Sequence, residues 1–406
     1  MQSVPKSLRL QIGLFGRRNV GKSSLLNAIA RQQVSIVSEQ AGTTTDPIEK
    51  PMELLPLGPV LLIDTAGIDD EGTLGSLRKQ RSESVLDRAD LGVLVTEADS
   101  WGLFEDSLLE ELKKRKVPVL VVINKSDLQM PSKQNLFSIE FKGCAAVTCS
   151  ANTGDGIADV IEAMLRLAPS DHFECRHLIS DLVQPGDTAL LVTPIDKQAP
   201  KGRLILPQVM TIRDLLDGGS IPMVCQQDGI PSALENLRNP PAIVITDSQA
   251  FDLVSEKVPE SVPMTSFSIL MARFQGDLTE MVRSAKAISN LKEGDRVLIL
   301  ETCSHHPTGD DIGRVKIPNW LRKFVGAQLK FEHAHGRDFP ENLSPYKLVI
   351  HCGNCMGNRR EMLNRIHRCR SVGVPITNYG LTIAYSLGIL ERALKPFPNV
   401  LDNVFV

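Results

Sequence analysis

The fold of the first part of the chain is decided by the stretch Gly16-Arg17-Arg18-Asn19-Val20-Gly21-Lys22-Ser23, which fits the pattern G-x-x-x-x-G-K-[S/T]. An apolar run at residues 8–15 is typical of a strand, and a helical pattern follows at residues 22–31. Between such elements, the backbone N–H groups of a glycine-rich loop surround phosphates, and the helix N-terminus adds its positive dipole. The stretch therefore predicts a nucleotide-binding domain of the P-loop type.

Individual residues of this loop have expected roles in binding GTP and metal. We expect Lys22 to neutralise charge on the β and γ phosphates and Ser23 to ligate Mg²⁺. The GTP contacts expected from the loop and the start of its helix come from Gly16, Asn19, Gly21, Lys22, Ser23 and Ser24.

Two further segments follow in the order that a GTPase requires. Gly42-Thr43-Thr44-Thr45-Asp46 supplies a switch threonine, and we expect Thr44 to ligate Mg²⁺. In Asp64-Thr65-Ala66-Gly67, Asp64 would act on Mg²⁺, usually through water, and the Gly67 amide would sense the γ-phosphate. The residues expected to support hydrolysis are Lys22, Thr44, Asp64 and Gly67.

The base pocket is predicted from Asn124-Lys125-Ser126-Asp127 and Ser150-Ala151. Asp127 would accept hydrogen bonds from guanine N1 and N2, which adenine cannot supply. We expect the pocket to comprise Asn124, Lys125, Asp127, Ser150 and Ala151. Together these segments resemble the translation-factor-like GTPases, and the guanine-specific element favours GTP over ATP.

Two residues bear on the mechanism of hydrolysis. Ile68 stands where Ras-like enzymes place a water-orienting glutamine. Asn19 stands where a subgroup of these GTPases holds a potassium ion, which would neutralise transition-state charge. We therefore expect slow, potassium-stimulated hydrolysis, with the alternative that Asn19 only caps the loop.

The chain is expected to be α/β throughout. Short apolar runs at residues 60–63, 91–95 and 117–123 predict buried strands of a mostly parallel sheet. Three domains are expected: a GTPase domain at residues 1–168, a small α/β domain at 169–265 and a third α/β domain at 266–406. The third domain shows strand patterns at 296–300 and 347–350, and helical patterns at 276–288, 359–370 and 382–394.

A second candidate site lies in this third domain. Cys303 follows the first of its strands, and Cys352 and Cys355 follow the second. Because the carboxyl ends of parallel strands lie at one edge, these cysteines can converge. Three readings stay open: structural zinc completed by His305, His306 or His351, a 4Fe–4S cluster on three cysteines with one free iron position, or a redox-active C-x-x-C pair.

The remaining cysteines and basic residues have plainer expected roles. We expect Cys144, Cys149, Cys175, Cys225 and Cys369 to be core residues or inert thiols. A polar loop is favoured for His333 and His335. A basic helix follows the C-x-x-C pair and is expected to present a solvated face, with contact to an anionic cluster or partner as the alternative. Its arginines are Arg359, Arg360, Arg365, Arg368 and Arg370.

Composition limits the classes of function. Residues 271–406 hold 19 Lys and Arg against 13 Asp and Glu, a balance of +6, so a total of −3 leaves −9 for the rest. Because the sequence shows no long apolar run and no apolar leader, we expect a cytoplasmic protein with no membrane span. Aromatic residues make up 4% and the pI is about 6.3, which argues against a nucleic-acid binder.

The combination Cys303-Ser304-His305 and His351-Cys352-Gly353-Asn354-Cys355 behind a GTPase domain resembles the FeFe-hydrogenase maturation GTPases, the HydF family. The resemblance covers essentially the whole chain, including Asp196-Lys197-Gln198-Ala199-Pro200-Lys201-Gly202 of the middle domain. It implies that the middle domain is a dimerisation domain, that the protein is a homodimer, and that the third domain binds a 4Fe–4S cluster. The implied ligands are Cys303, Cys352 and Cys355, with His305 or His351 as a possible fourth.

The resemblance also implies a scaffold or carrier function. Such a protein receives a di-iron precursor with CO and cyanide ligands, made with two radical-SAM maturases, and delivers it to the apo FeFe-hydrogenase. The main alternative is an RNA-associated GTPase of tRNA modification or ribosome assembly with a zinc-binding C-terminal domain. A plain GTP-dependent metal chaperone is a third hypothesis.

Overall fold

The computed structural model of the chain describes residues 4–32, 47–55, 57–65, 83–170, 176–194, 204–302, 311–336 and 338–405. It divides into two compact units, Met1–Cys175 and Arg176–Val406, and each is described by itself. The expected boundary at 168 lies close to this division, whereas the expected boundary at 265 lies inside the second unit. The three-domain division therefore stays a prediction.

The first unit is built on a six-stranded sheet in the order β2-β3-β1-β4-β5-β6. Only β2 and β3 are antiparallel, and the other neighbours are parallel. The strands are β1 (Leu10–Phe15), β2 (Ile48–Leu54), β3 (Gly58–Asp64), β4 (Leu91–Glu97), β5 (Val119–Asn124) and β6 (Ala145–Thr148). Every residue of β1 and β5 is buried, as expected for apolar strands covered on both faces. The predicted mostly parallel sheet is confirmed.

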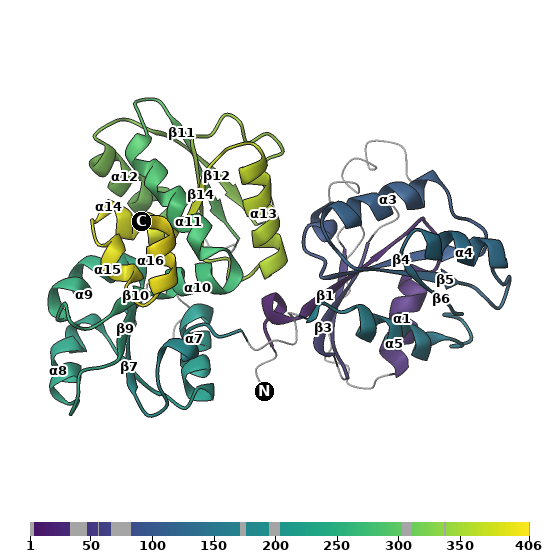
Figure 1. Cartoon of the computed structure of the whole chain (residues 1–406), viewed down its shortest axis with the longest axis horizontal. Coiled ribbons are helices and arrows are strands. Elements are labelled where there is room, and N and C mark those ends of the chain that lie inside the picture. Colours follow the sequence, from purple (N-terminus) through teal and green to yellow (C-terminus); the bar gives the residue numbers. More distant parts are fainter. Residues whose placement is uncertain are drawn as a thin grey trace. The chain divides into compact units, whose positions relative to one another are not determined.

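Helices cover both faces of this sheet (Figure 1). Helices α1 (Lys22–Gln32) and α5 (Ile157–Leu167) share one apolar core with the sheet. Helices α3 (Leu103–Lys114) and α4 (Lys133–Phe141) share a second core on the other face. A 3₁₀ turn, η1 (Lys6–Leu8), precedes β1. The arrangement leaves the carboxyl ends of the parallel strands free to form a site at one edge.

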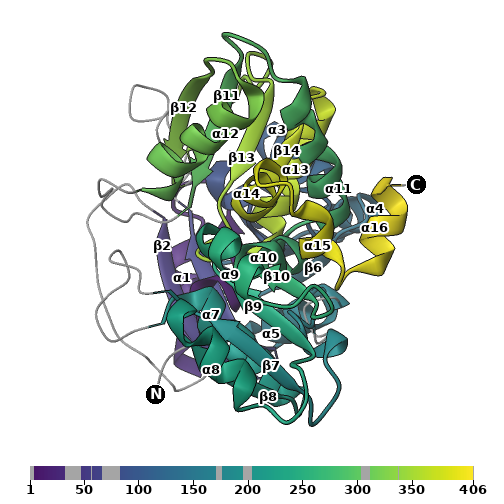
Figure 2. The same ribbon diagram turned by 90° about the vertical axis from the view of Figure 1, so that its left-hand side faces the viewer.

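The second unit begins with a four-stranded parallel sheet in the order β10-β9-β7-β8. Its strands are β7 (Thr188–Val192), β8 (Ile221–Cys225), β9 (Ile243–Thr246) and β10 (Met264–Ser266). The helices and 3₁₀ turns between them are η2 (Ser180–Leu182), α7 (Leu206–Asp217), η3 (Gln227–Gly229), α8 (Ile230–Glu235), η4 (Ser248–Ala250) and α9 (Phe251–Lys257). Figure 2 shows β8 at the end of this sheet, next to β7.

A second four-stranded parallel sheet follows in the order β12-β11-β13-β14. Its strands are β11 (Arg296–Glu301), β12 (Lys330–His335), β13 (Leu348–His351) and β14 (Ile376–Asn378). Around it lie α10 (Phe267–Gln275), α11 (Leu278–Ala285), η5 (Lys286–Asn290), the π-helical turn η6 (Ile312–Lys316), α12 (Ile317–Val325), α13 (Arg359–Ser371), α14 (Tyr379–Ser386), α15 (Leu390–Leu394) and α16 (Pro398–Phe405). No helix of the described residues is long and apolar enough to cross a membrane.

Three expectations for the second unit were wrong in detail. His333 and His335 lie on β12 rather than in a polar loop, because an edge strand can carry polar side chains. The helix expected at 382–394 is two helices, and Gly388 between them has a φ of 73° that ends the first. The helix expected at 276–288 begins at Leu278, because the Asp277 side chain caps it.

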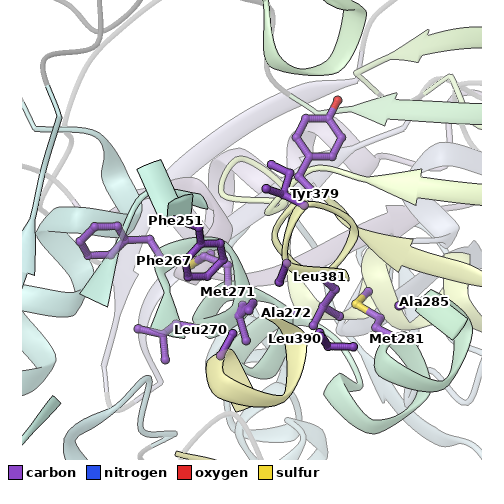
Figure 3. Close-up of a cluster of buried hydrophobic side chains, with 14 of the residues drawn as sticks. Phe251, Phe267, Leu270, Met271, Ala272, Met281, Ala285, Tyr379, Leu381 and Leu390 are labelled. Carbon is purple, nitrogen blue, oxygen red and sulfur yellow. The ribbon is translucent and has the colours of Figure 1, made fainter. Parts of the chain in front are cut away.

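One apolar core runs through both sheets of the second unit. Figure 3 shows part of it, where Phe251 and Phe267 lie near Leu270 and Met271, and α14 contributes Leu381. Helix α10 directly follows β10 of the first sheet and packs against α13 and α14 beside the second. The shared core therefore makes the two sheets one folding body, in line with their grouping into one compact unit.

Candidate GTP site and cysteine site

The phosphate loop between β1 and α1 depends on its two glycines. A Cβ atom on Gly16, which has a φ of 143°, would lie 2.2 Å from the Val95 carbonyl oxygen. A Cβ atom on Gly21, which has a φ of 93°, would lie 2.2 Å from Asn124 Nδ2. No side chain fits at either position, so the loop is packed directly onto β4 and the β5 end.

The expected metal ligands Ser23 and Asp64 meet at the start of α1. Ser23 Oγ donates to Asp64 Oδ2 at 2.5 Å, and Lys22 Nζ donates to Gly16 O at 2.9 Å and to Arg17 O at 2.7 Å. Asp64 Oδ1 is buried and has no hydrogen-bond partner among the described residues. Burial raises the pKa of Asp64, while the Ser23 hydrogen bond and the Lys22 charge oppose this rise. A buried carboxylate oxygen without a donor, beside a hydroxyl, fits a Mg²⁺ ion.

An ion pair that sequence reasoning missed fixes the first arginine of the loop. Arg17 donates from Nε and Nη2 to the two oxygens of Glu105, at 2.7 and 2.9 Å, and Glu105 is buried. Glu105 also accepts from Gly102 N, so it caps α3 at the same time. The Arg17 guanidinium lies 5.0 Å from the Phe104 ring centroid. The only signal in the sequence was an acidic residue in the first turn of a helix.

The base-pocket segments meet at the ends of β5 and β6. Asn124 Nδ2 donates to Val20 O at 2.9 Å, and Asn124 Oδ1 accepts from Ala151 N at 3.0 Å. This side chain therefore joins the phosphate loop to the second base-pocket segment. Ser150 Oγ donates to Asp127 Oδ1 at 2.6 Å, and this hydrogen bond lowers the pKa of Asp127. Asp127 is thus held as an exposed carboxylate that can accept from a base.

Asn19 and Lys125 both have backbone conformations in the left-handed region. Asn19 has a φ of 64° and is exposed, and Lys125 has a φ of 62°. Asparagine is one of the few residues other than glycine that adopts this conformation readily. Asn19 therefore has a structural reason for its place in the loop, whether or not its side chain also binds a cation. Ser24 is exposed on the first turn of α1.

Several predicted site residues lie outside the described residues. They are Thr44, Gly67, Ile68, Cys175, Cys303, His305 and His306, together with the middle-domain segment 196–202. Their roles stay predictions.

The strand ends predicted to bring the cysteines together are neighbours. Strands β11 and β13 are parallel, with Leu300 opposite His351. Thr302, the residue before Cys303, donates to Cys352 Sγ from its backbone N at 3.3 Å, and its hydroxyl lies 3.2 Å from the same sulfur. The hydroxyl can donate to an ionised sulfur, and the two Thr302 groups together would then stabilise a Cys352 thiolate. Sequence reasoning missed Thr302, although its place between a strand end and a cysteine was a usable signal.

The turn between Cys352 and Cys355 is fixed by an asparagine. Asn354 has a φ of 54°, is buried, and donates from Nδ2 to Asn358 O at 3.1 Å. Burial and the neighbouring Cys352 raise the pKa of Cys355 to about 11. A raised pKa at the second cysteine is also typical of redox-active C-x-x-C pairs, in which the first cysteine attacks, so the redox interpretation stays a prediction. The Cys355 sulfur, which is costly to ionise alone, and the Cys352 sulfur, which accepts from Thr302 N, fit a pair that binds a metal or an iron–sulfur cluster. Among the described residues, no group of three or more His, Cys, Asp or Glu side chains could hold a metal ion by itself.

Both ring nitrogens of His351 have protein partners. Its Nδ1 lies 2.8 Å from Cys352 O, and its Nε2 lies 2.6 Å from Arg365 Nη1. The His351 side chain is fully buried, and Arg365 is 5% exposed. Arg365 also donates to Glu361 Oε1 at 2.7 Å. The ring is therefore part of a buried polar network between β13 and α13.

A second polar group lies at the same sheet edge and was not expected. Tyr379 OH donates to Glu301 Oε1 at 3.0 Å, and Glu301 Oε2 lies 3.4 Å from His335 Nδ1. Figure 3 shows the Tyr379 hydroxyl directed away from the apolar side chains around it. Burial, with Glu301 and Cys352 nearby, raises the pKa of Tyr379 well above its usual value, so the hydroxyl stays protonated.

The arginines of α13 are largely used within the protein. Arg359 donates to Phe274 O at 3.1 Å and to Gly276 O at 2.6 Å, both at the C-terminal end of α10. Arg368 donates to Pro340 O, and Arg370 to Glu280. Helix α13 is therefore not simply a solvated basic face, because these three arginines donate hydrogen bonds to main-chain carbonyls and to one carboxylate.

The other described cysteines are plain thiols, as expected. Cys144, Cys149 and Cys369 are buried, and Cys225 is half-buried. Burial raises the pKa of Cys149 and of Cys369 to about 12.

A P-loop GTPase domain is what this sheet, loop and base pocket define, and residues 11–125 match the family model of the 50S ribosome-binding GTPases. The rest of the chain matches two models that belong together, the Hydrogen maturase F dimerization domain at residues 178–276 and the Hydrogen maturase F tetramerization domain at 279–396. The chain belongs to the hydrogen maturase F (HydF) family of hydrogenase maturation GTPases.

The tRNA modification GTPases MnmE among the curated relatives match the GTPase domain alone. The tRNA modification GTPase MnmE of Prochlorococcus marinus (strain MIT 9303) is 41% identical over 160 residues, 39% of this chain and 34% of that protein. GTPase Der of Wolinella succinogenes is 35% identical over 133 residues, 32% of this chain and 28% of that protein. The chain thus spans about a third of the length of these relatives. The structure of Aquifex aeolicus Era bound to GDP·AlF₄⁻ is 20% identical, with a TM-score of 0.34 over 53% of this chain and 93% of that chain.

Proposed function

We propose that this protein is a GTP-hydrolysing scaffold of FeFe-hydrogenase maturation that carries a 4Fe–4S cluster on Cys303, Cys352 and Cys355. The observation that carries the proposal is the contact of the Thr302 backbone N and hydroxyl with Cys352 Sγ, at the edge where β11 and β13 end. That contact brings the residue before Cys303 to the sulfur of Cys352, in a chain whose other unit is a GTPase domain. A bound cluster would offer one iron with an exchangeable ligand.

The GTPase unit supplies a nucleotide switch in this proposal. Ser23 and Asp64 would hold Mg²⁺, and Asp127 and Asn124 would form the guanine side of the pocket, each from the position described above. Lys22, now bonded to loop carbonyls, would turn to the β and γ phosphates. Binding and hydrolysis of GTP would then time the exchange of partners rather than act on iron.

The proposed cargo is a di-iron precursor with CO and cyanide ligands, received with the help of radical-SAM maturases and passed to the apo FeFe-hydrogenase. Cyanide-bearing iron is anionic, and residues 271–406 carry a charge balance of +6. Because Arg359, Arg368 and Arg370 are bonded within the protein, the attraction would act through the overall field rather than through these side chains.

The family models for dimerization and tetramerization domains support an oligomer, and we propose a homodimer. The alternative of an RNA-associated GTPase with a zinc-binding domain now rests on the GTPase unit alone. Residues 178–276 and 279–396 match hydrogen maturase F models instead.

Two variants separate the sites. We expect Cys303→Ala to prevent cluster assembly and hydrogenase activation while GTP hydrolysis stays at the wild-type rate. Lys22→Ala should lower hydrolysis at least a hundredfold, because a phosphate-binding cation is lost from the transition state, and should spare cluster assembly. Iron and sulfide reconstitution under anaerobic conditions, EPR spectroscopy and a phosphate-release assay provide the measurements.

Cys225→Ala is the matched control, because Cys225 is a half-buried thiol in β8, outside both sites. A wild-type protein that takes up zinc but no iron would rule out the cluster. Full hydrogenase activation by Cys303→Ala would rule out the carrier function.

A further inference from the structure

The tautomer of His351 follows from its partners. Arg365 can only donate hydrogen bonds, so the Nε2 atom of His351, 2.6 Å from Arg365 Nη1, must be the acceptor. The ring proton then sits on Nδ1, which donates to Cys352 O at 2.8 Å. Neither nitrogen has a lone pair available in this arrangement, since one lone pair faces a guanidinium and the other nitrogen carries a proton.

Arg365 is held in place from three sides. It donates to Glu361 Oε1 at 2.7 Å and to Gly336 O at 3.1 Å, and its guanidinium lies 5.5 Å from the Phe339 ring centroid. The side chains of Arg365 and Glu361 are 6% and 10% exposed. Moving Arg365 away from His351 would therefore disturb a buried ion pair, which costs far more than moving a surface side chain.

Hydrogen bonds therefore fix Cys352 at both its main chain and its side chain. His351 donates to its carbonyl oxygen, Thr302 N donates to its sulfur, and the Thr302 hydroxyl lies 3.2 Å from the same sulfur. The carbonyl fixes the direction in which the chain enters the turn to Cys355, while the Thr302 contacts fix the rotation of the Cys352 side chain. Partners that orient a metal ligand in this way tune its site without touching the metal.

We propose that His351 is a positioning residue that fixes the Cys352 main chain through Nδ1, backed by Arg365 and Glu361, and that it is not a ligand of the cluster. The proposal rests on the proposed function, in which the cysteines hold a 4Fe–4S cluster. The exchangeable ligand of the fourth iron is then a group other than His351.

Three variants test the proposal on reconstituted full-length protein. His351→Asn keeps an amide donor near the place of Nδ1, whereas His351→Leu removes it. The double variant Glu361→Gln and Arg365→Met removes the ion pair that supports His351 and leaves the imidazole in place. Because both charges are removed together, no unpaired charge remains buried. The measurements are iron content, the rate of iron loss to a chelator, and nitrogen hyperfine couplings in pulsed EPR of the reduced cluster, with and without ¹⁵N-labelled histidine.

For a positioning residue, we expect His351→Asn to bind the wild-type amount of iron with unchanged hyperfine couplings. His351→Leu and the double variant should lose iron about tenfold faster or more, the usual effect of removing a partner that orients a ligand. Fluorescence of Trp320, which lies in the same unit, shows whether each variant is folded. If His351→Leu does not fold, the other two variants carry the test.

Two results would overturn the proposal. One is a histidine nitrogen coupling in the wild-type cluster that disappears in His351→Asn. The other is tighter iron retention by the double variant, because a ligand histidine would be released for binding when Arg365 is removed. A wild-type protein that takes up no iron at all would instead refute the proposed function, and this inference with it.

Discussion

At the scale of single residues, the ionised Asp64 carboxylate destabilises the protein, and a bound metal ion can relieve this effect. Its Oδ1 atom is buried without a hydrogen-bond partner among the described residues, and burial raises its pKa. The fold therefore favours the neutral carboxyl. In the absence of metal, the ionised group destabilises the protein increasingly as the pH rises above the ordinary pKa of an aspartic acid.

We predict that Asp64→Asn leaves the nucleotide-free protein as stable as wild type or more stable, by about 0–1 kcal/mol at pH 7. The gain should vanish as the pH falls toward 4, where wild-type Asp64 also becomes neutral. Thermal unfolding without Mg²⁺ at both pH values measures it, and Mg²⁺·GTP should stabilise only the wild type. Asp127→Asn is the control with the opposite sign, because a hydrogen bond lowers the pKa of Asp127. Equal stabilisation of Asp64→Asn by Mg²⁺·GTP would contradict the metal assignment.

A second residue, Asn19, combines two possible roles that a pair of substitutions can separate. Its φ of 64° suits glycine, so Asn19→Gly keeps the loop conformation and removes the side chain with its amide oxygen. We predict GTP binding within about threefold of wild type and equal hydrolysis rates in potassium and sodium. Asn19→Ala, the matched comparison, adds left-handed strain of about 1 kcal/mol and should weaken binding as well. If Asn19→Gly keeps a potassium preference, the cation is held elsewhere.

At the scale of elements, α10 joins the start of the second unit to the helix after the cysteine turn. Arg273 on α10 pairs with Asp181 and donates to Leu178 O at 3.1 Å. At its C-terminal end, the carbonyls of Phe274 and Gly276 accept from Arg359, the first residue of α13. Helix-end carbonyls would otherwise lack partners, so Arg359 acts as a cap from another helix.

We predict that Arg359→Met lowers the free energy of unfolding of the second unit by about 1–3 kcal/mol, since two charged hydrogen bonds are lost. Urea unfolding followed by Trp320 fluorescence in a Trp101→Phe background isolates this unit, because the chain has two tryptophans. Arg213→Met is the control. The Arg213 side chain is 75% exposed and pairs along its own helix with Asp217, so its loss should change stability by less than about 0.5 kcal/mol. Equal effects of both variants would show that the α10 cap contributes nothing.

The elements also show which parts of the structure sequence reasoning can reach. Strands β1, β3, β4 and β5 were predictable because they are short, apolar and buried, and the loop motif placed them in a known order. Strand β12 was not, because its edge position lets charged and histidine side chains replace the apolar pattern. Strands β10 and β14 have only three residues each and run straight into helices capped by Ser266 and Asn378, so no pattern could form.

The candidate sites divide in the same way. The convergence of the β11 and β13 ends followed from the rule for parallel strands, and the base-pocket segments followed from their motifs. The partners of these residues did not. Arg365 reaches His351 from a helix, and Glu105 reaches Arg17 from 88 positions away. Such contacts depend on the tertiary packing of side chains, which a single sequence does not encode locally.

At the scale of the whole molecule, the first sheet of the second unit ends in an open strand. Strand β8 pairs only with β7 among the described residues, whereas the opposite edge strand β10 is packed against α15. On β8, Ile221 is 54% and Val224 is 43% exposed, and Leu216 on the neighbouring α7 is 55% exposed. An exposed apolar edge strand invites pairing with another chain, and the matched family model names this region a dimerization domain.

We therefore predict that Val224→Lys converts the proposed homodimer to a monomer, because it places a charge in the strand that would pair with a second copy. Sedimentation velocity at micromolar concentration gives the readout, and the fluorescence of Trp320, which lies in the same unit as Val224, reports an intact fold. Leu253→Lys on α9 is the matched control, since Leu253 is 49% exposed but lies away from β8, and it should leave the dimer unchanged. A Val224→Lys protein that sediments as wild type would place the interface on another surface. Loss of the dimer in both variants would show that added charge, rather than the β8 edge, decides association.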